Sequence, residues 1–406
     1  MHSRDPILCT SLSDALHATS MASSQQPFTH ERYTMNFTIE RAALLRSLAH
    51  VQSVVERRNT IPILSNVKIE AAKGRLLLTA TDMDLEVVES VAVHTAGPGA
   101  TTVPAHTLYD IVRKLPDGAE VTFDSGGDAE KLIMRCGRSR FTLPCLPVAD
   151  FPVMSGADLA HQFRVSPNAL RGLIDRTRFA ISTEETRYYL NGIYLHTAKR
   201  HGADVLRAVA TDGHRLASVE VPLPDGAAGM PGVILPRKTV AEVRKLIDEA
   251  ADDIVIALAE TKIRFTFNDA VLTSKLIDGT FPDYEKVIPT GNEKQLDVDT
   301  KLFADAVDRV SAISSEKSRA VKLAVANGTL VLSASSPEYG SATEELEVDY
   351  AGEALEIGFN SRYLLDIAQQ IEGASARLLM ADASSPTLLR EVGDESAIYV
   401  LMPMRV

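Results

Sequence analysis

One sequence unit occurs three times in succession along the chain, and this repetition limits the possible folds more than any other feature. The 372 residues from Met35 to the end divide into three units of about 124, a common size for one domain. Three sequence landmarks recur in the same order in each unit. Self-similarity at a fixed period indicates repeated structural units, so we expect three tandem copies of one fold.

An extended segment that leads into an amphipathic helix opens each unit. The copies read FTIERAALLRSLAHVQSVV from Phe37, FRVSPNALRGLIDRTRFAIS from Phe163 and LDVDTKLFADAVDRVSAIS from Leu296. Apolar residues recur three or four positions apart in these segments, as on one face of a helix. In the second copy, Ser166 and Pro167 suit the N-cap and the first helical turn.

A strand that runs into a turn is the second landmark. It appears as LLLTATDMDLEVVESVAV, LRAVATDGHRLASVEVPL and LVLSASSPEYGSATEELEV. In the first copy Met83, Leu85 and Val87 alternate with acidic residues, which predicts one half-buried strand through this stretch. The third landmark is a short helix led by proline or asparagine, in VPAHTLYDIVRKL, LPRKTVAEVRKLI and FNSRYLLDIAQQI.

Together these landmarks predict an α+β fold with two helices and several antiparallel strands in each unit. A parallel sheet is disfavoured, because no helix of about 10–15 residues follows each strand. We expect the units at residues 35–157, 158–290 and 291–406. Residues 1–34 are rich in Ser, Thr and His without apolar periodicity, so we expect them to be a disordered N-terminal extension.

Charge is distributed unevenly along the chain. The formal net charge of −12 by itself argues against a nucleic-acid binder. The six expected helices nevertheless sum to +10, which leaves −22 for the rest. Solvated helix faces often gather Lys and Arg, so an ordinary helix surface is one interpretation; the other is a basic surface that meets phosphate. The windows used are 41–58, 104–114, 167–178, 236–247, 300–319 and 360–371.

The sequence offers little support for a membrane protein or an enzyme. No apolar run reaches the roughly 18–20 residues that span a bilayer, and three cysteines are too few for a disulfide framework. The Walker-type phosphate loop and the HExxH, CxxC and GxSxG motifs are absent from the sequence. We expect no catalytic residue, metal or cofactor. A metal-assisted hydrolase using Asp212 and His214 stays a minor alternative, because no third ligand phrase accompanies them.

Nine phrases spread over all three units match one known pattern. They are NTIPILSNV (59–67), TATDMDLE (79–86), TVPA (102–105), GRSRF (137–141), RYYLNGI (187–193), ATDGHRLA (210–217), TSKLIDGTFPDY (273–284), IGFNSRYLLD (357–366) and YVLMPMRV (399–406). Together they resemble the family of bacterial sliding clamps, the beta subunits of DNA polymerase III. The resemblance covers the chain from Met35 to Val406.

The resemblance implies three tandem clamp domains in a head-to-tail homodimeric ring, with helices inside and sheets outside. Such a ring encircles duplex DNA, tethers the replicative polymerase and is a processivity factor, not an enzyme. Basic helices and an acidic remainder suit this function, because phosphate attraction without base contacts permits sliding. The implied partners include the clamp loader and repair and translesion polymerases, and the implied location is the cytoplasm, at the nucleoid. A clamp paralogue with different partners is the alternative.

A pocket for partner peptides between the second and third units is also implied. Flexible methionines suit a groove that accepts many peptides, although edge-strand packing would explain the same terminal MPM sequence. The matching positions are Leu190, Thr211, Gly213, His214, Arg215, Leu216, Pro282, Lys286, Val287, Asn360, Tyr363, Ser384, Pro386, Val400, Leu401, Met402, Pro403, Met404 and Arg405.

For DNA contact the resemblance favours Arg58, at the end of the first helix, and the Arg187-Tyr188-Tyr189 loop. These tyrosines could stack on an exposed base, or be half-buried on a strand. For the dimer seam, the first unit of one copy should meet the third unit of the other. The seam candidates are Arg138, Arg140, Phe141 and Leu143 against Ala312, Ile313 and Glu344.

Three positions depart from the family's pattern. Ser318 stands where an aromatic residue often lines the pocket, so we expect that wall to be smaller. Lys286 keeps the charge of a basic pocket residue but lacks a planar guanidinium. His106 stands where a permanent cation is common, so DNA attraction there should be weaker and pH-dependent.

Overall fold

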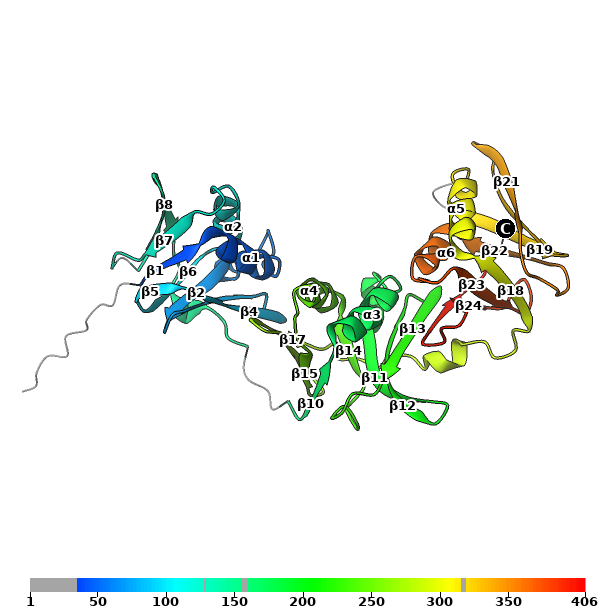
Figure 1. Ribbon diagram of the computed structural model, residues 1–406, viewed down its shortest axis with the longest axis horizontal. Coiled ribbons are helices and arrows are strands. Elements are labelled where there is room, and N and C mark those ends of the chain that lie inside the picture. Colours follow the sequence, from blue (N-terminus) through cyan, green and yellow to red (C-terminus); the bar gives the residue numbers. More distant parts are fainter. Residues whose placement is uncertain (1–34, 128, 155–158, 315–318, 406) are drawn as a thin grey trace, which may run out of the picture.

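The computed structural model describes residues 35–127, 129–154, 159–314 and 319–405. Three copies of one unit follow one another along an open arc (Figure 1). The expected extension over residues 1–34 and the departure at Ser318 lie outside the described residues.

We call the units repeat 1, repeat 2 and repeat 3. Repeat 1 contains β1 (Asn36–Glu40), α1 (Arg41–Gln52), η1 (Pro62–Ser65), β2 (Asn66–Ala72), β3 (Arg75–Thr81), β4 (Leu85–Ala92), β5 (His94–Gly97), β6 (Gly99–Pro104), α2 (Ala105–Arg113), β7 (Glu120–Asp124), β8 (Lys131–Cys136), β9 (Ser139–Pro144) and η2 (Val148–Asp150). Repeat 2 contains β10 (His161–Val165), α3 (Pro167–Arg178), η3 (Glu185–Leu190), β11 (Gly192–Arg200), β12 (Ala203–Thr211), β13 (Arg215–Pro222), β14 (Val233–Pro236), α4 (Arg237–Ile247), β15 (Ile254–Leu258), β16 (Lys262–Thr266), β17 (Ala270–Lys275) and η4 (Tyr284–Val287). Repeat 3 contains β18 (Lys294–Asp299), α5 (Thr300–Ser311), β19 (Ala320–Ala326), β20 (Thr329–Ser336), β21 (Gly340–Glu347), β22 (Leu355–Asn360), α6 (Ser361–Ala368), β23 (Ser375–Met380), β24 (Thr387–Glu391) and β25 (Ala397–Leu401).

The first hairpin of every repeat turns through the same backbone conformation. The turn residues Lys73–Gly74, His201–Gly202 and Asn327–Gly328 all have positive φ, between 47° and 85°. A two-residue turn with both φ values positive matches the right-handed twist of the flanking strands. The repetition predicted from the sequence therefore extends to single backbone angles.

All six expected helices are present, but two end six or more residues earlier than the apolar pattern predicted. The expected helix 41–58 ends at Gln52, and the expected helix 300–319 ends at Ser311. After Gln52 the backbone tightens into i to i+3 hydrogen bonds, which direct Val54 and Val55 into the core. The apolar pattern therefore continues past the end of α1, because Val54 and Val55 are buried although they are no longer helical.

Each joint between repeats is made by one continuous antiparallel sheet. The first eight-stranded sheet has the order β10-β15-β16-β17-β4-β3-β2-β6, so β17 of repeat 2 pairs with β4 of repeat 1. The second has the order β14-β11-β12-β13-β25-β24-β23-β18, so β13 pairs with β25 of repeat 3. The ends of the arc carry a five-stranded sheet that ends at β9 and a four-stranded sheet that ends at β21.

Helices line one side of this arc. Figure 1 shows α1 and α2, α3 and α4, and α5 and α6 in pairs on the concave side, with the sheets outside them. Each helix buries one apolar face against its sheet; in α1 this face is Leu44, Leu48 and Val51. The opposite faces of the six helices therefore point into the hollow of the arc.

Polar contacts reinforce the joint between repeats 1 and 2. His50, in the last turn of α1, lies between two carboxylates. Its Nδ1 is 2.6 Å from Glu89 Oε1 on β4, and its Nε2 is 3.0 Å from Glu249 Oε1, just after α4. Nearby, Lys238 of α4 donates to Asp82 Oδ2 at 2.5 Å. Protonated His50 can donate to both carboxylates at once, so the joint is held most firmly when the imidazole is charged.

We expect the stability of this joint to fall as the pH rises. Burial lowers the pKa of His50, but hydrogen bonds and charges from Glu89 and Glu249 outweigh burial and raise the pKa above 6.5. The stabilisation is therefore complete below pH 6.5 and is lost as the pH passes the raised pKa. Urea titrations at pH 6 and pH 9 should show a larger loss of unfolding free energy for the native chain than for His50→Gln, by about 2 kcal/mol. Equal losses would show that His50 does not hold the joint.

Candidate functional site

A pocket with a mainly apolar lining lies where repeats 2 and 3 meet. It encloses about 250 Å³ and is open to solvent. The walls come from η3, the turn between β12 and β13, the η4 segment and the end of β25. Its lining residues are Leu190, Thr211, Gly213, Arg215, Leu216, Pro282, Asp283, Tyr284, Val287, Val400 and Met402.

The turn between β12 and β13 forms one wall through a specific set of hydrogen bonds. Thr211 Oγ1 accepts from the Gly213 amide at 3.1 Å, and Asp212 Oδ1 accepts from the amides of His214 and Arg215 at 2.9 and 3.0 Å. Gly213 has a φ of 87°, and a Cβ there would lie 2.8 Å from Arg187 Nη1. Glycine therefore suits this position in both conformation and space.

Repeat 1 has the same turn, and this corrects one prediction. Met83 has a φ of 78° and its side chain is 47% exposed, so it belongs to a turn and not to the predicted strand. The strand β4 begins only at Leu85, because Asp82 Oδ1 accepts from the amides of Asp84 and Leu85 at 2.9 and 2.7 Å. Apolar alternation alone did not reveal this carboxylate-capped turn.

The C-terminal segment forms the opposite wall. In β25, Val400 faces the pocket, whereas Leu401 is fully buried in the main core. Successive side chains of a strand point to opposite faces, so the prediction that Leu401 lines the pocket is wrong. Beyond the strand, the Met402 amide donates to His214 O at 2.9 Å and the Met404 amide donates to Gly358 O at 2.8 Å. These bonds fix the segment that carries both methionines.

Arg215 fastens repeats 2 and 3 together beneath the pocket. Its guanidinium donates to Asp212 Oδ2 at 3.1 Å, to Asp366 Oδ2 at 2.5 Å and to Phe179 O at 2.6 Å. It also lies 4.3 Å from the centre of the Tyr363 ring. With all these partners the charge is satisfied inside the protein, so Arg215 is a structural joint as well as a lining residue.

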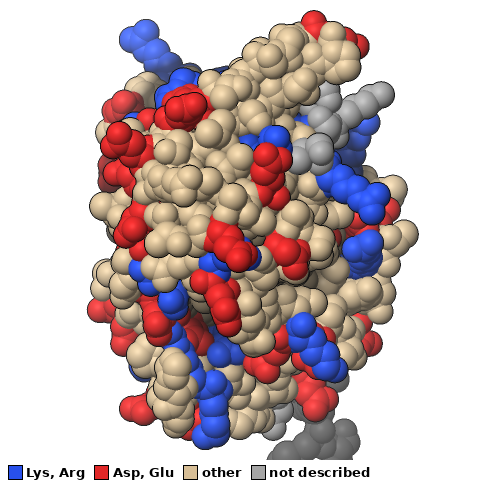
Figure 2. Space-filling model, turned by 90° about the vertical axis from the view of Figure 1, so that its right-hand side faces the viewer, with Lys and Arg blue, Asp and Glu red and all other residues tan. Residues whose placement is uncertain are grey.

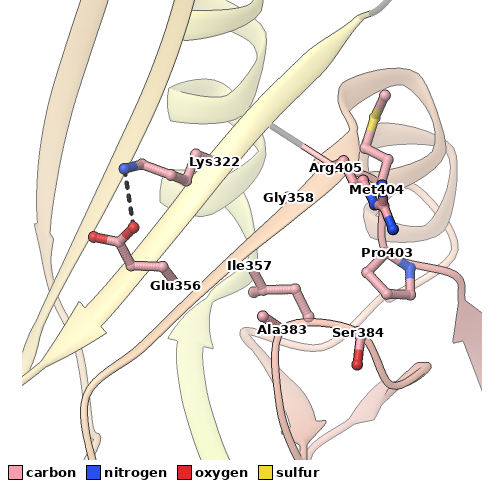
Figure 3. Close-up of a pocket in the computed structure, with 9 residues that line it drawn as sticks. All are labelled: Lys322, Glu356, Ile357, Gly358, Ala383, Ser384, Pro403, Met404 and Arg405. Carbon is pink, nitrogen blue, oxygen red and sulfur yellow. Dashed lines mark hydrogen bonds and ion pairs between the residues drawn. The ribbon is translucent and has the colours of Figure 1, made fainter.

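A larger and more polar groove of about 570 Å³, which we call the adjoining groove, is lined by Pro403, Met404 and Arg405, the residues that follow Met402 of the pocket in the chain (Figure 3). Its lining includes the exposed ion pair between Lys322 Nζ and Glu356 Oε2, at 3.1 Å. The loop that carries Ser384 is held by Asp382, whose carboxylate accepts four hydrogen bonds from Ser384 and Ser385 and has a lowered pKa as a result. The groove is lined by Lys322, Glu356, Ile357, Gly358, Ala383, Ser384, Pro403, Met404 and Arg405.

The residues predicted for the pocket divide into three groups. Nine line the pocket: Leu190, Thr211, Gly213, Arg215, Leu216, Pro282, Val287, Val400 and Met402. Four line the adjoining groove: Ser384, Pro403, Met404 and Arg405. The others, apart from the buried Leu401, lie nearby or support the walls: His214 stacks on Tyr363, Asn360 caps α6, Pro386 accepts a hydrogen bond, and Lys286 extends into solvent beside Asp283.

Asp283 and Tyr284 line the pocket but were not predicted. Both lie in the phrase TSKLIDGTFPDY, directly after the predicted Pro282. An aromatic residue that follows proline in a linker between apolar units is a usable signal, because such a residue usually packs on a neighbouring surface. Only the proline in this phrase was assigned a role.

Basic residues are concentrated on three of the six helices. The helices α1, α3 and α4 carry formal charges of +2, +2 and +3, and the other three are neutral. The six helices as observed therefore sum to +7 and the rest of the chain to −19. This charge difference is smaller than the predicted one, because the predicted helices extended past the observed helix ends. The outer end of repeat 3 shows scattered acidic side chains among fewer basic ones (Figure 2).

The predicted DNA contacts lie outside the six α-helices. Arg58 is exposed in the loop six residues after α1, not at its end. Tyr188 and Tyr189 belong to the short 3-10 helix η3, and neither a free loop nor a strand describes them. Tyr188 is 53% exposed and meets Tyr189 edge to face at 5.7 Å, while Arg187 pairs with Glu184 at 3.1 Å. His106 is less available, because its Nε2 bonds Val55 O at 2.8 Å.

The predicted seam residues lie at the two ends of the arc. Arg138, next to β9, and Arg140 in it are exposed, and Phe141 is partly exposed. Leu143 is buried in the core of repeat 1, so it cannot supply the apolar centre of a seam. At the other end, Ala312 and Ile313 follow α5, and Glu344 of β21 accepts from Arg309 at 3.0 and 2.5 Å.

The described residues do not support the hydrolase alternative. Both carboxylate oxygens of Asp212 are engaged by its own turn and by Arg215, and His214 stacks on Tyr363 at 6.3 Å. Within the described ranges, no group of three His, Cys, Asp or Glu side chains is arranged to hold a metal ion. No described helix combines the length and apolar character needed to cross a membrane.

Comparison with known proteins decides the family. Models of the N-terminal, central and C-terminal domains of the DNA polymerase III beta subunit match residues 35–155, 164–283 and 285–405. The chain belongs to the bacterial sliding-clamp family. It is 57% identical to the beta sliding clamp of Caulobacter vibrioides and 39% identical to that of Escherichia coli, with 92% of this chain and all of each relative covered.

Solved clamp structures agree with this membership. A Caulobacter crescentus clamp has a TM-score of 0.90 at 57% identity, and a Bartonella birtlesii clamp bound to griselimycin has a TM-score of 0.89 at 51% identity. Each covers 92% of this chain and all of the other. The clamp family comprises non-catalytic processivity factors of DNA polymerase III that bind DNA, form homodimeric rings and bind polymerases and other partners, as the sequence resemblance implied.

Proposed function

We propose that two copies of this clamp close head to tail around duplex DNA and hold DNA-processing proteins there through the pocket between repeats 2 and 3. The observation that carries the ring is the pair of sheet edges at the ends of the arc. Within the described residues, β9 and β21 each have a neighbour on one side only. Unpaired edges are templates for pairing with another strand.

The joints within the chain indicate how these two edges would meet. At the first joint β17 pairs with β4, and within the repeats β17 is the equivalent of β9 and β4 the equivalent of β21. Matching the hairpin registers makes Phe141 the equivalent of Leu272, and Ala342 the equivalent of Val87. Because Leu272 pairs with Val87, the seam would set Phe141 against Ala342 of the partner subunit.

The other seam residues fit around this centre. Arg138 and Arg140 lie beside Phe141, and Ala312, Ile313 and Glu344 lie at the other end of the arc. Apolar contacts at the centre with charges at the rim are typical of protein interfaces. Two copies of this seam would close a two-fold ring in which each β9 and each β21 has a partner strand, which favours a closed dimer over an open filament.

Short peptides with apolar anchors fit the pocket. Its lining is mainly apolar, and Met402 and Val287 are 42% and 50% exposed at its rim. The clamp loader and the replicative, repair and translesion polymerases would all use this site, in competition with one another. The adjoining groove over Pro403 and Met404 extends the surface for residues that flank the anchors. Griselimycin, which binds the Bartonella birtlesii clamp, would bind this clamp in the same pocket.

DNA would pass through the hollow of the arc, near the basic helices. Arg58, Arg187, Tyr188 and Tyr189 are the proposed contacts outside those helices. The double variant Arg58→Ala/Arg187→Ala should bind primed DNA more weakly at every sequence, and its affinity should depend less steeply on salt, by a slope of about 1–2. Fluorescence anisotropy at several salt concentrations measures both. Arg75→Ala, on a strand outside the hollow, is the matched control, and an unchanged slope in the double variant would exclude these contacts.

Processive synthesis tests the proposed function directly. Primer extension with polymerase III core, clamp loader and ATP should give far longer products when this clamp is present. A clamp that leaves product length unchanged would contradict the proposal. We also propose that the ring works at the nucleoid within the cytoplasm, and that its domains span residues 35–157, 158–290 and 291–406.

A further inference from the structure

A partly buried polar cluster lies behind one wall of the peptide pocket, the wall formed by η4 and the residues just before it. The ring of Tyr284 lines the pocket, while its hydroxyl lies 3.0 Å from His196 Nε2 and 2.9 Å from Arg207 Nη1. His196 is on β11 and Arg207 is on β12, and neither lines the cavity. The cluster therefore touches the wall from behind without touching a ligand.

The directions of these hydrogen bonds follow from the partners. His196 Nδ1 lies 2.9 Å from the carbonyl oxygen of Thr197, which can only accept, so Nδ1 carries the hydrogen. In the neutral ring Nε2 is then an acceptor, and the Tyr284 hydroxyl donates to it. Arg207 can only donate, so the Tyr284 oxygen accepts from Nη1. Each of these three hydrogen bonds therefore has one direction.

Arg207 is itself held in place by two carboxylates. Its Nε donates to Glu220 Oε2 at 3.0 Å, and Nη1 also approaches Glu285 Oε1, at 3.1 Å. Glu285 belongs to η4, the segment that carries Tyr284 and Val287. From its place on β12, Arg207 therefore forms hydrogen bonds with two successive residues of this wall, Tyr284 and Glu285.

Aromatic stacking completes the support. Tyr194 stacks on His196 at 4.5 Å and on Phe281 at 4.9 Å, with interplanar angles of 21° and 8°. Phe281 in turn meets Tyr284 edge to face at 6.4 Å. The residues before η4 are thus fixed by packing, and the start of η4 by hydrogen bonds.

We infer that His196 and Arg207 are positioning residues for the partner pocket, which set its affinity for ligands by holding the Tyr284 hydroxyl and the wall from Pro282 to Val287. This inference rests on the proposed function of the pocket. The end of this wall has few packing contacts of its own, since Val287 is 50% exposed and Lys286 extends into solvent. A wall that is already in place on binding avoids the entropy cost of ordering it.

The cluster should also make ligand affinity depend on pH. Burial has the largest effect and lowers the pKa of His196; the hydrogen bond to Thr197 O opposes it, the nearby Arg207 charge lowers the pKa further, and Glu285 has the smallest, opposite effect. The other groups that face the ring are the Tyr194 and Tyr284 rings. When His196 becomes protonated at low pH, Nε2 becomes a donor, so the Tyr284 hydrogen loses its acceptor and two cations face each other. The wall should then loosen.

The test uses the full chain and griselimycin as the probe, with affinity measured by isothermal titration calorimetry. Tyr284→Phe keeps the ring that lines the pocket and removes only the hydroxyl. It should weaken binding about 5- to 30-fold at pH 7.5, the usual effect of one or two lost buried hydrogen bonds. Arg207→Met should weaken binding at least as much. Tyr339→Phe removes a hydroxyl from a residue that is 62% exposed and lies outside the pocket lining, so it should leave the affinity unchanged.

The pH profile separates positioning from a general loss of stability. In a series from pH 7.5 to pH 4.5, native clamp should bind more weakly as the pH falls through the lowered pKa of His196, whereas Tyr284→Phe should lack most of this dependence. The inference is overturned if Tyr284→Phe binds within twofold of native, or if it keeps the native pH slope. Failure of the native clamp to bind griselimycin at all would instead contradict the proposed pocket function, so the two failures are distinguishable.

Discussion

A clamp in which Met402 and Val287 are both replaced by aspartate is expected to lose griselimycin affinity at least ~100-fold while folding normally. Binding would bury two carboxylates in a lining that is mainly apolar, and the cation in that lining, Arg215, is already paired with Asp212 and Asp366. In the free chain these side chains are 42% and 50% exposed, so water solvates the new charges before binding. The cost therefore falls on the complex and not on the fold.

Calorimetry at neutral pH measures this loss, and thermal unfolding checks the fold. Val392→Asp is the matched control, because Val392 is 39% exposed in repeat 3 and does not line the pocket. We expect the control to bind like the native chain. If the double variant keeps its affinity, the ligand binds elsewhere and the pocket assignment is wrong.

A second large effect is expected at the seam. Ala342→Glu places a carboxylate at the half-buried centre of β21, opposite Phe141 of the partner subunit in the proposed register. Desolvating this charge against an aromatic ring should weaken the dimer about 100-fold or more. Within one chain Ala342 lies on an edge strand, so the monomer should stay folded.

Analytical ultracentrifugation over a range of concentrations measures the dimer. Ala96→Glu is the control, because Ala96 is exposed on β5, at the other edge of the five-stranded sheet, away from β9. It should dimerise like the native chain. A fully dimeric Ala342→Glu variant would rule out the β9–β21 seam.

The sequence predicted the architecture well because the architecture is repeated. Each landmark occurs in three copies, so each helix or strand was predicted from three separate sequences. The resemblance to the clamp family also extends over all the described residues. Helix α3 was predicted at its observed bounds, since Ser166 caps it and Pro167 begins it. Helix α1 was overextended, because buried Val54 and Val55 continue its apolar pattern after the backbone has turned.

The pocket was predicted less completely, because the direction of a side chain and contacts between residues far apart in the sequence leave no local pattern. Val400 and Leu401 are neighbours in one strand, and only the pleat decides which of them reaches the pocket. Met83 looked like a strand residue, because the bond from Asp82 that makes its turn is invisible in an apolar pattern. The support of Tyr284 by His196 and Arg207 joins residues 77 to 88 positions apart, which no local pattern can predict.

Retention on DNA tests the central claim most directly. Clamp loaded onto nicked circular DNA with a clamp loader and ATP is separated from free clamp by gel filtration, before and after the circle is cut once. We predict that the clamp stays on the circle and leaves the linear DNA by sliding off its ends. Equal retention on both forms, or retention on neither, would contradict a ring that encircles the duplex.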